Sequence, residues 1–257
     1  MSIKNNFPIL EFDPDTEAFI EPDRVIGPVE NMPERCVICF FKEVVDGLAD
    51  KDRLHVLAEL RNEHGVVPVY AMEFEGEKIA VFAPLIGAPA AAGLLEEAIA
   101  LGCRKFIACG GAGVLREDMA VGHLVVPVSA VRDEGTSYHY LPPAREVEAD
   151  GHAIEAIKRV LDRHGADYIT AKTWTTDAFY RETRGKVALR KSEGCVTVEM
   201  ECSAFFAVSK FRGVTFGQIL YGGDDLSGNE WDGRAWNSRR EIRESIFRLA
   251  AECCMEL

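Results

Sequence analysis

The chain has 257 residues, of which 47% are hydrophobic and 28% charged, a composition that excludes a mainly disordered protein. It carries 29 Lys and Arg against 42 Asp and Glu, which gives a formal net charge of −13 at pH 7. Because nucleic acids and anionic membranes attract positive charge, this balance argues against both as partners. No run of 18 apolar residues predicts a membrane span.

Eight cysteines lie mostly within apolar runs, as expected for reduced, buried thiols in a cytoplasmic protein. Cys36 and Cys39 have the spacing of a metal or redox pair, but residues three apart in a strand point to opposite faces. The six histidines are scattered, so the sequence predicts no metal cofactor. The first six residues lack an apolar stretch, which argues against a secretory signal.

Taken in chain order, the pattern begins with an acidic, proline-rich arm over residues 1–33. A domain over residues 34–257 follows. Apolar runs predict seven strands there: Arg35–Phe41, Val66–Phe74, Glu77–Ala83, Lys105–Cys109, His123–Val128, Tyr168–Thr175 and Thr215–Tyr221.

Helical spacing of apolar residues predicts the intervening elements. The predicted helices are 50–64, a segment ending at Leu101 before Gly102, Asp150–His164, Glu199–Phe211, and Ser238–Cys254 opened by a Ser238–Glu241 capping box. Strands and helices alternate without a linker or repeat. The fold class is therefore α/β, a single three-layer α/β/α domain with a central mixed sheet.

A glycine run, Gly110-Gly111-Ala112-Gly113, directly follows the predicted strand Lys105–Cys109. Small residues at the end of a strand let a ligand approach backbone N–H groups, which can hold anionic oxygens. The alternative is a tight turn packed under a neighbouring helix. The residues alone favour neither.

An acidic pair, Glu199-Met200-Glu201, opens a predicted helix. A carboxylate at the edge of a cleft can accept two hydrogen bonds from a vicinal diol such as that of ribose. Residues two apart on a helix do not share a face, so the two glutamates should differ in role. Without further context, an acid that complements the helix dipole is the simpler reading.

Two further segments carry candidate side chains. Asp224-Asp225 follows a strand and Gly222-Gly223, where a partly desolvated carboxyl can act as a general acid or simply form a polar turn. Phe179 lies in a loop after a strand, where its ring can stack on a planar ring or belong to the core.

The order and spacing of these segments resemble the nucleoside phosphorylase family, in its hexameric branch of uridine phosphorylases, purine nucleoside phosphorylases and nucleosidases. The resemblance runs from about residue 77 to 226 and looks closest to uridine phosphorylase-like members. It is carried by these segments: 86–89, 110–113 with 121–122, 132–140, 176–180, Glu199-Met200-Glu201 and 223–224.

The resemblance implies a phosphorylase-like fold and cleavage of a nucleoside's N-glycosidic bond by phosphate, without a cofactor. It implies that Glu201 holds the ribose hydroxyls, with Met200 and Glu199 in the ribose site. Phe179 would stack on the base, and Asp224, or Asp225 one residue later, would assist its departure as an acid. The implied phosphate site comprises Gly87, Gly110, Gly111 and Arg24.

The sequence departs from the family pattern at the phosphate site. The nearest match to the family's Pro-Gly-Asp-Pro-x-x-Arg segment is Glu21-Pro22-Asp23-Arg24, which lacks the glycine. Ala108 stands where an arginine precedes the glycine run, and an arginine donated by a second subunit falls near Gly65. Either water is the nucleophile or other residues replace these cations, the candidates being Arg24, Arg35, His64 and Arg116.

The base-recognition pair Gln-x-Arg of uridine-type enzymes is also absent, because Thr183 and Gly185 occupy those positions. Preference for uracil or a purine therefore stays open. We expect a cytoplasmic nucleoside phosphorylase that assembles as a dimer or trimer of dimers. A nucleosidase that uses water is the first alternative, and a non-catalytic nucleoside-binding protein the second.

Overall fold

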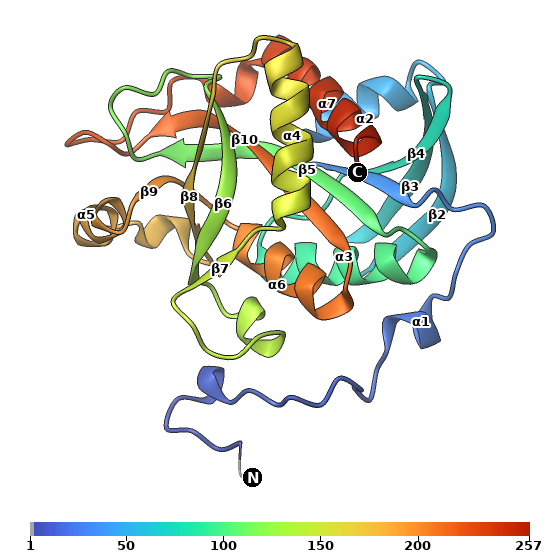
Figure 1. The fold of residues 1–257 in the computed structure, drawn as a ribbon, viewed down its shortest axis with the longest axis horizontal. Coiled ribbons are helices and arrows are strands. Elements are labelled where there is room, and N and C mark those ends of the chain that lie inside the picture. The colour runs from blue at the N-terminus through green and yellow to red at the C-terminus, as the bar shows by residue number, and fades with distance from the viewer. Residues whose placement is uncertain (1–2) are drawn as a thin grey trace.

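A ten-stranded mixed sheet runs through the middle of the molecule (Figure 1). This computed structural model describes residues 3–257; Met1 and Ser2, part of the predicted arm and of the segment predicted to lack a secretory signal, lie outside them. The strand order is β10-β6-β8-β9-β5-β1-β4-β3-β2, with β7 beside β6. Since β10 also pairs with β5, five strands close on one another.

The strands are β1 (Arg35–Cys39), β2 (Leu54–Asn62), β3 (Gly65–Phe74), β4 (Glu77–Phe82), β5 (Lys105–Val114), β6 (Leu124–Asp133), β7 (Glu146–Glu148), β8 (Tyr168–Thr176), β9 (Cys195–Glu199) and β10 (Thr215–Asp225). The α-helices are α1 (Pro22–Val25), α2 (Lys42–Ala49), α3 (Ala88–Leu101), α4 (Gly151–Arg163), α5 (Arg184–Ser192), α6 (Cys202–Arg212) and α7 (Arg240–Met255). Short 3₁₀ turns occur at η1 (Pro8–Leu10), η2 (Thr136–His139), η3 (Phe179–Arg181) and η4 (Trp236–Ser238).

Helices cover both faces of the sheet (Figure 1). Helices α3 and α6 bury one face, where Phe106, Phe205 and Phe216 form part of the core. Helices α2, α4 and α7 bury the other, around residues such as Val37, Ile107 and Ile157. The predicted three-layer α/β/α arrangement with a mixed sheet is confirmed.

Continuous apolar runs identify the central strands. Residues Cys36–Cys39 of β1 are all fully buried, because β1 lies between β4 and β5 under helices on both faces. Each of the eight cysteines is buried and free. Burial raises the pKa of the Cys36 and Cys109 thiols well above the ordinary value, so these side chains behave as small apolar groups.

The predicted helix over residues 50–64 is wrong. The segment forms strand β2, which pairs antiparallel with β3 through a two-residue connection after Asn62. Leu54 and Leu60 imitate helical spacing, but both point inward from a strand with a bulge between Val56 and Ala58. The helix of this region lies earlier, at α2.

Three further elements begin or end at residues other than those predicted. The glycine run is not a turn but the end of strand β5. Glu199 ends strand β9, and helix α6 begins only at Cys202, with Glu201 at its N-cap. The Ser238–Glu241 capping box does not form, since α7 begins at Arg240 and the Ser238 hydroxyl bonds the Ala235 carbonyl. Helix α5 was not predicted.

The N-terminal segment runs along one side of the molecule in extended form (Figure 1). The Val29 N–H donates to the Leu101 carbonyl at 3.0 Å. Arg212 of α6 bridges Glu21 and Glu96 and so ties the segment to helices α6 and α3. Further out, the Phe19 side chain is fully exposed.

Within residues 3–257, no helix combines the length and the apolar character needed to cross a membrane.

Candidate active site

Glu201 lies at the junction of β9 and α6, and only 6% of its surface is exposed. Its Oε1 accepts the Gly87 N–H at 2.6 Å, which joins it to the N-cap of α3. The backbone N–H of Met200 is a second donor to this carboxylate. Burial, and then the nearby Glu199 charge, raise the Glu201 pKa to about 8. Since a carboxylate can accept about four hydrogen bonds, lone pairs are left for a ligand.

Gly87 contributes a backbone donor where a side chain could not be accommodated without strain. Its φ of 98° lies in the region that favours glycine, and an added Cβ would meet no atom within 4 Å. The glycine therefore serves backbone direction rather than close packing. It aims its N–H at Glu201.

Glu199 is engaged by protein groups on both oxygens. Its Oε2 accepts the N–H groups of Glu201 and Cys202 at 2.8 and 2.6 Å, and its Oε1 accepts the Thr175 hydroxyl at 2.6 Å. Burial raises its pKa to about 7. These bonds favour a role for Glu199 in orienting Glu201 at the start of α6 rather than in direct contact with a sugar.

A third buried carboxylate supports this corner from the β6 side. Glu134 accepts the Ser203 hydroxyl at 2.9 Å and the N–H and hydroxyl of Ser137. Ser203 also donates its N–H to the Thr175 hydroxyl at 2.9 Å. The serines and threonine thus connect Glu134 to Glu199 and fix the first turn of α6.

Asp224 lies near the end of β10, and its Oδ2 accepts the Trp231 indole N–H at 2.7 Å. A Cβ added at Gly113 would lie 3.0 Å from Val198 and 3.6 Å from Asp224 Oδ1, so Gly113 links the ends of β9 and β10. Asp225 instead accepts the Ser227 N–H and pairs its backbone with Asp232. Of the two predicted acids, Asp225 shapes the turn.

Phe179 begins the short turn η3 after β8, and its ring is half exposed. It packs on Tyr180, with 4.1 Å between ring centroids. Thr175 of β8 pairs with Glu199 of the parallel strand β9, so Phe179 and Glu201 follow strands that end at the same edge. Just after η3, burial and then the Asp224 charge raise the Glu182 pKa to about 7.

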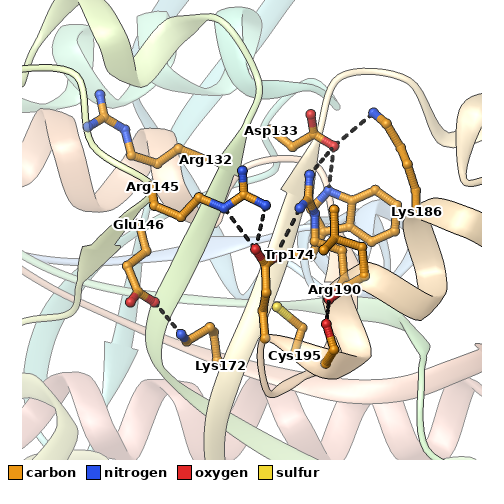
Figure 2. A network of polar contacts seen from close by, with 12 residues as sticks. Arg132, Asp133, Arg145, Glu146, Lys172, Trp174, Lys186, Arg190 and Cys195 are labelled. Atoms are coloured by element: carbon orange, nitrogen blue, oxygen red, sulfur yellow. Dashed lines mark hydrogen bonds and ion pairs between the residues drawn. The ribbon is translucent and has the colours of Figure 1, made fainter.

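The segment that carries Phe179 and Glu182 lies between β8 and α5, and a polar network joins these two elements to β6 (Figure 2). Asp133 Oδ2 accepts the Trp174 indole N–H at 3.0 Å, and Lys186 and Arg190 of α5 lie 2.9 and 3.1 Å from the same oxygen. The Arg190 guanidinium also lies over the Trp174 ring. Upstream, Asp177 accepts the Gly135 N–H at 2.8 Å. The segment is therefore held at both ends.

The glycines of β5 do not form one anion cradle. Successive strand residues face opposite sides of the sheet, so the Cβ positions of Gly110 and Gly111 lie on opposite faces. A Cβ at Gly110 would lie 3.2 Å from the Phe40 ring, and one at Gly111 would lie 3.1 Å from Tyr221 and 3.2 Å from Trp236. Aromatic rings cover both glycines.

The cations considered from sequence lie elsewhere. Arg24 is in α1, bonds Glu17 and lines a cavity of about 540 Å³ that includes neither Gly110 nor Gly111. Arg35 pairs with Lys105 at the start of β5, roughly 17 Å of strand before the glycines. Arg116 bonds Asp118, and His64 lies in the β2–β3 connection. The structure brings none of them to the glycine run.

Several residues of this region were not predicted. Phe40, Tyr221 and Trp236 are aromatic residues of ordinary core type, and no local pattern marks them as site residues. Glu182 could have been noticed as an acid within the base-side loop. Among residues 3–257, no group of three His, Cys, Asp or Glu side chains could hold a metal ion.

Known proteins that are similar to this chain are phosphorylases. The family profile described as the Phosphorylase superfamily matches residues 34–253. A guanosine phosphorylase from Halorubrum lacusprofundi is 28% identical over 187 residues, covering 72% of this chain and 76% of that protein. A uridine phosphorylase from Escherichia coli is 24% identical over 190 residues, covering 66% and 75%.

Solved structures show the same fold at low sequence identity. A purine nucleoside phosphorylase from Toxoplasma gondii, in complex with immucillin-H, aligns with a TM-score of 0.75 and 20% identity over 88% of this chain and 91% of that one. A uridine phosphorylase from Vibrio fischeri aligns with a TM-score of 0.73 and 22% identity over 94% and 98%. With the profile match over residues 34–253, these likenesses identify the chain as a member of the phosphorylase superfamily.

Proposed function

We propose that the chain is a nucleoside phosphorylase, a pentosyltransferase that cleaves a nucleoside with phosphate to give a free base and ribose 1-phosphate. The single observation that carries the proposal is Glu201, a buried carboxylate that is held by the Gly87 N–H and keeps lone pairs for a ligand. The family's uridine and guanosine phosphorylases support the choice of reaction.

In the proposed reaction, charge develops at both ends of the breaking C1′–N bond. Hydrogen bonds donated by the ribose hydroxyls favour the ionised form of Glu201, whose negative charge then favours the positive charge of the oxocarbenium-like sugar. Phe179 stacks on the base. Asp224 donates a hydrogen bond or a proton to the departing base nitrogen, while the incoming nucleophile bonds to C1′.

A nucleosidase that uses water is the second candidate, and one observation favours it. The Phe40 ring covers Gly110, and Arg24 bonds Glu17 instead of the glycine run. A phosphate would need another cation in this protein or from a neighbouring copy. The two candidates share the ribose and base contacts and differ in the nucleophile.

The test is a nucleoside panel of uridine, inosine and guanosine, assayed with and without phosphate, with sugar products identified. We expect ribose 1-phosphate and phosphate-dependent release of base. Free ribose at the same rate without phosphate would assign the nucleosidase reaction. Turnover of none of the three would contradict both.

Other features of the protein are part of the same proposal. We infer that residues 34–257 form the catalytic domain and residues 1–33 an arm packed on it. We also infer a cytoplasmic enzyme without a cofactor that assembles as a dimer or a trimer of dimers. Exposed apolar side chains on the arm, among them Phe19 and Ile20, support the assembly.

A further inference from the structure

The segment after β10 folds back onto the strand from which it leaves. We call residues 226–236 the return loop. Asp225 and Asp232 exchange backbone hydrogen bonds of 2.8 and 3.0 Å, which closes the loop at its base. Arg234 donates to the carbonyls of Gly223 and Met119 at 3.0 and 2.8 Å. The Trp231 bond to Asp224 adds a contact from the loop to the candidate acid.

The end of the return loop lies against the glycines of the site. Trp236 would come within 3.2 Å of a Cβ at Gly111 and within 3.3 Å of one at Gly223. Its carbonyl accepts the Tyr221 hydroxyl at 2.9 Å. Tyr221 is fully buried in β10, three residues before Asp224. One hydroxyl therefore joins the strand that carries Asp224 to the far end of the loop.

Arg243 of α7 fixes that hydroxyl. It is only 7% exposed, and its Nε donates to the Tyr221 oxygen at 3.2 Å. Its guanidinium carbon lies 5.2 Å from the ring centroids of both Phe41 and Trp236. Its Nη1 pairs with Glu43 at 2.5 Å. Helices α2 and α7 thus hold Tyr221 and Trp236 from the side of the sheet where Gly111 points.

A buried guanidinium adds little net stability, because removing its hydration offsets the ion pair, but its directed donors orient neighbouring groups. We propose that Tyr221 and Arg243 are positioning residues for the base end of the active site: they fix the return loop so that Trp231 holds Asp224 toward the departing base. This inference rests on the proposed function. Neither residue contacts the substrate.

The sharpest test is Tyr221→Phe, which removes one oxygen and leaves the ring packing. Arg243→Met is the second variant, and the controls are Tyr168→Phe, whose hydroxyl bonds exposed Asp162, and Arg248→Met on the same helix. Each is assayed with the best natural nucleoside and with 4-nitrophenyl riboside, whose leaving group departs without protonation. We expect roughly a 10-fold loss of kcat with the nucleoside and less than a 2-fold loss with the nitrophenyl compound.

A double-variant cycle separates positioning from a general structural effect. If Tyr221 acts through Asp224, then Tyr221→Phe should cost little more once Asp224→Asn is present. A full, additive loss in the double variant would overturn the proposal. So would equal losses on the two substrates.

A readout without activity keeps this inference separate from the proposed function. Trypsin should cleave after Arg234 several-fold faster in Tyr221→Phe and Arg243→Met than in the wild-type protein and the two controls. Unchanged protection at Arg234 would overturn the positioning role. A wild-type protein that turns over no nucleoside would instead contradict the proposed function, whatever the trypsin result.

Discussion

At the scale of single residues, Glu201 is the side chain on which the proposed chemistry depends most. Its carboxylate is buried, and Gly87 uses only one of its oxygens. A glutamine has the same shape but presents an amide where a second acceptor is needed. The substitution Glu201→Gln therefore tests the role of the carboxylate and changes little else.

We expect Glu201→Gln to lower kcat/KM for the best nucleoside by roughly 100-fold or more, in the range found for loss of a transition-state contact. The protein should remain folded, because the amide can still accept the Gly87 N–H. Steady-state kinetics with circular dichroism as the folding control provides the measurement. Activity within a few-fold of wild type would remove Glu201 from the site.

The same residue predicts how stability depends on pH. Its pKa is about 8 in the folded protein against 4.5 ordinarily, so the folded state holds the proton more tightly. Stability from this group is therefore complete below about pH 4.5 and is lost as pH rises through about 8. Urea unfolding at pH 6 and 8.5 should show a smaller loss of stability in Glu201→Gln than in wild type. An equal loss in both proteins would contradict the prediction.

Phe40 governs access to Gly110. Replacing it by alanine removes the ring that lies 3.2 Å from the added Cβ position and opens the backbone there. We expect Phe40→Ala to lower the phosphate KM several-fold, at a stability cost of about 2–4 kcal/mol for the lost packing. Phosphate titrations at saturating nucleoside, with thermal unfolding alongside, provide the measurement. An unchanged phosphate KM would indicate that the anion binds elsewhere.

Residue types could be predicted more readily than their partners. The ordered segments that resemble the nucleoside phosphorylase family singled out Glu201, Asp224 and Phe179, whereas the residue types alone left a structural alternative open for each. Their catalytic roles stay predictions. Phe40, Tyr221 and Arg243 were missed, since each becomes informative only through contacts with residues far away in the chain.

At the scale of elements, the Asp133 carboxylate at the end of β6 anchors helix α5 to the sheet. Asp133 accepts a hydrogen bond from the Trp174 indole N–H and forms ion pairs with Lys186 and Arg190 (Figure 2). The Arg190 side chain is buried. Asp133→Asn removes one of the two carboxylates that pair with that guanidinium, the other being Glu193, which should cost about 1–3 kcal/mol. The nucleoside KM should rise more than kcat falls, because the Phe179 segment loses its anchor.

The control for Asp133→Asn is Asp162→Asn, which removes only an exposed partner of Tyr168. Urea unfolding and nucleoside kinetics are compared for both variants. A change in kcat alone, with an unaltered KM, would argue against anchoring of the Phe179 segment.

Predicted elements were correct where a strand is buried on both faces or a helix is capped by glycine, as at Cys36–Cys39 and Gly102. They were wrong at 50–64, where Leu54, Leu57 and Ala58 have helical spacing while Leu54 and Leu60 also fit one face of a strand. They were incomplete at β5, where glycine propensity suggested a turn. Pairing with β1 and β10 extends that strand, a tertiary effect that local patterns do not contain.

At the scale of the whole molecule, the arm and the body differ in accessibility. Phe19 is fully exposed, and its backbone makes no hydrogen bond among the described residues. We expect chymotrypsin to cut first after Phe19, with Phe19→Ser as the control that abolishes this product. Mass spectrometry identifies the cut. A first cut within residues 34–257 would show that the arm is covered, for instance by a second copy of the chain.

All eight thiols lie inside the folded body, and burial lifts the pKa of several of them, including Cys253 and Cys254. A sulfhydryl reagent can therefore react only when the packing opens. The alkylation rate of these native thiols therefore measures how often the packing opens, and no added label is needed. Slow alkylation that quickens with urea would report cooperative opening, and bound nucleoside should slow it further.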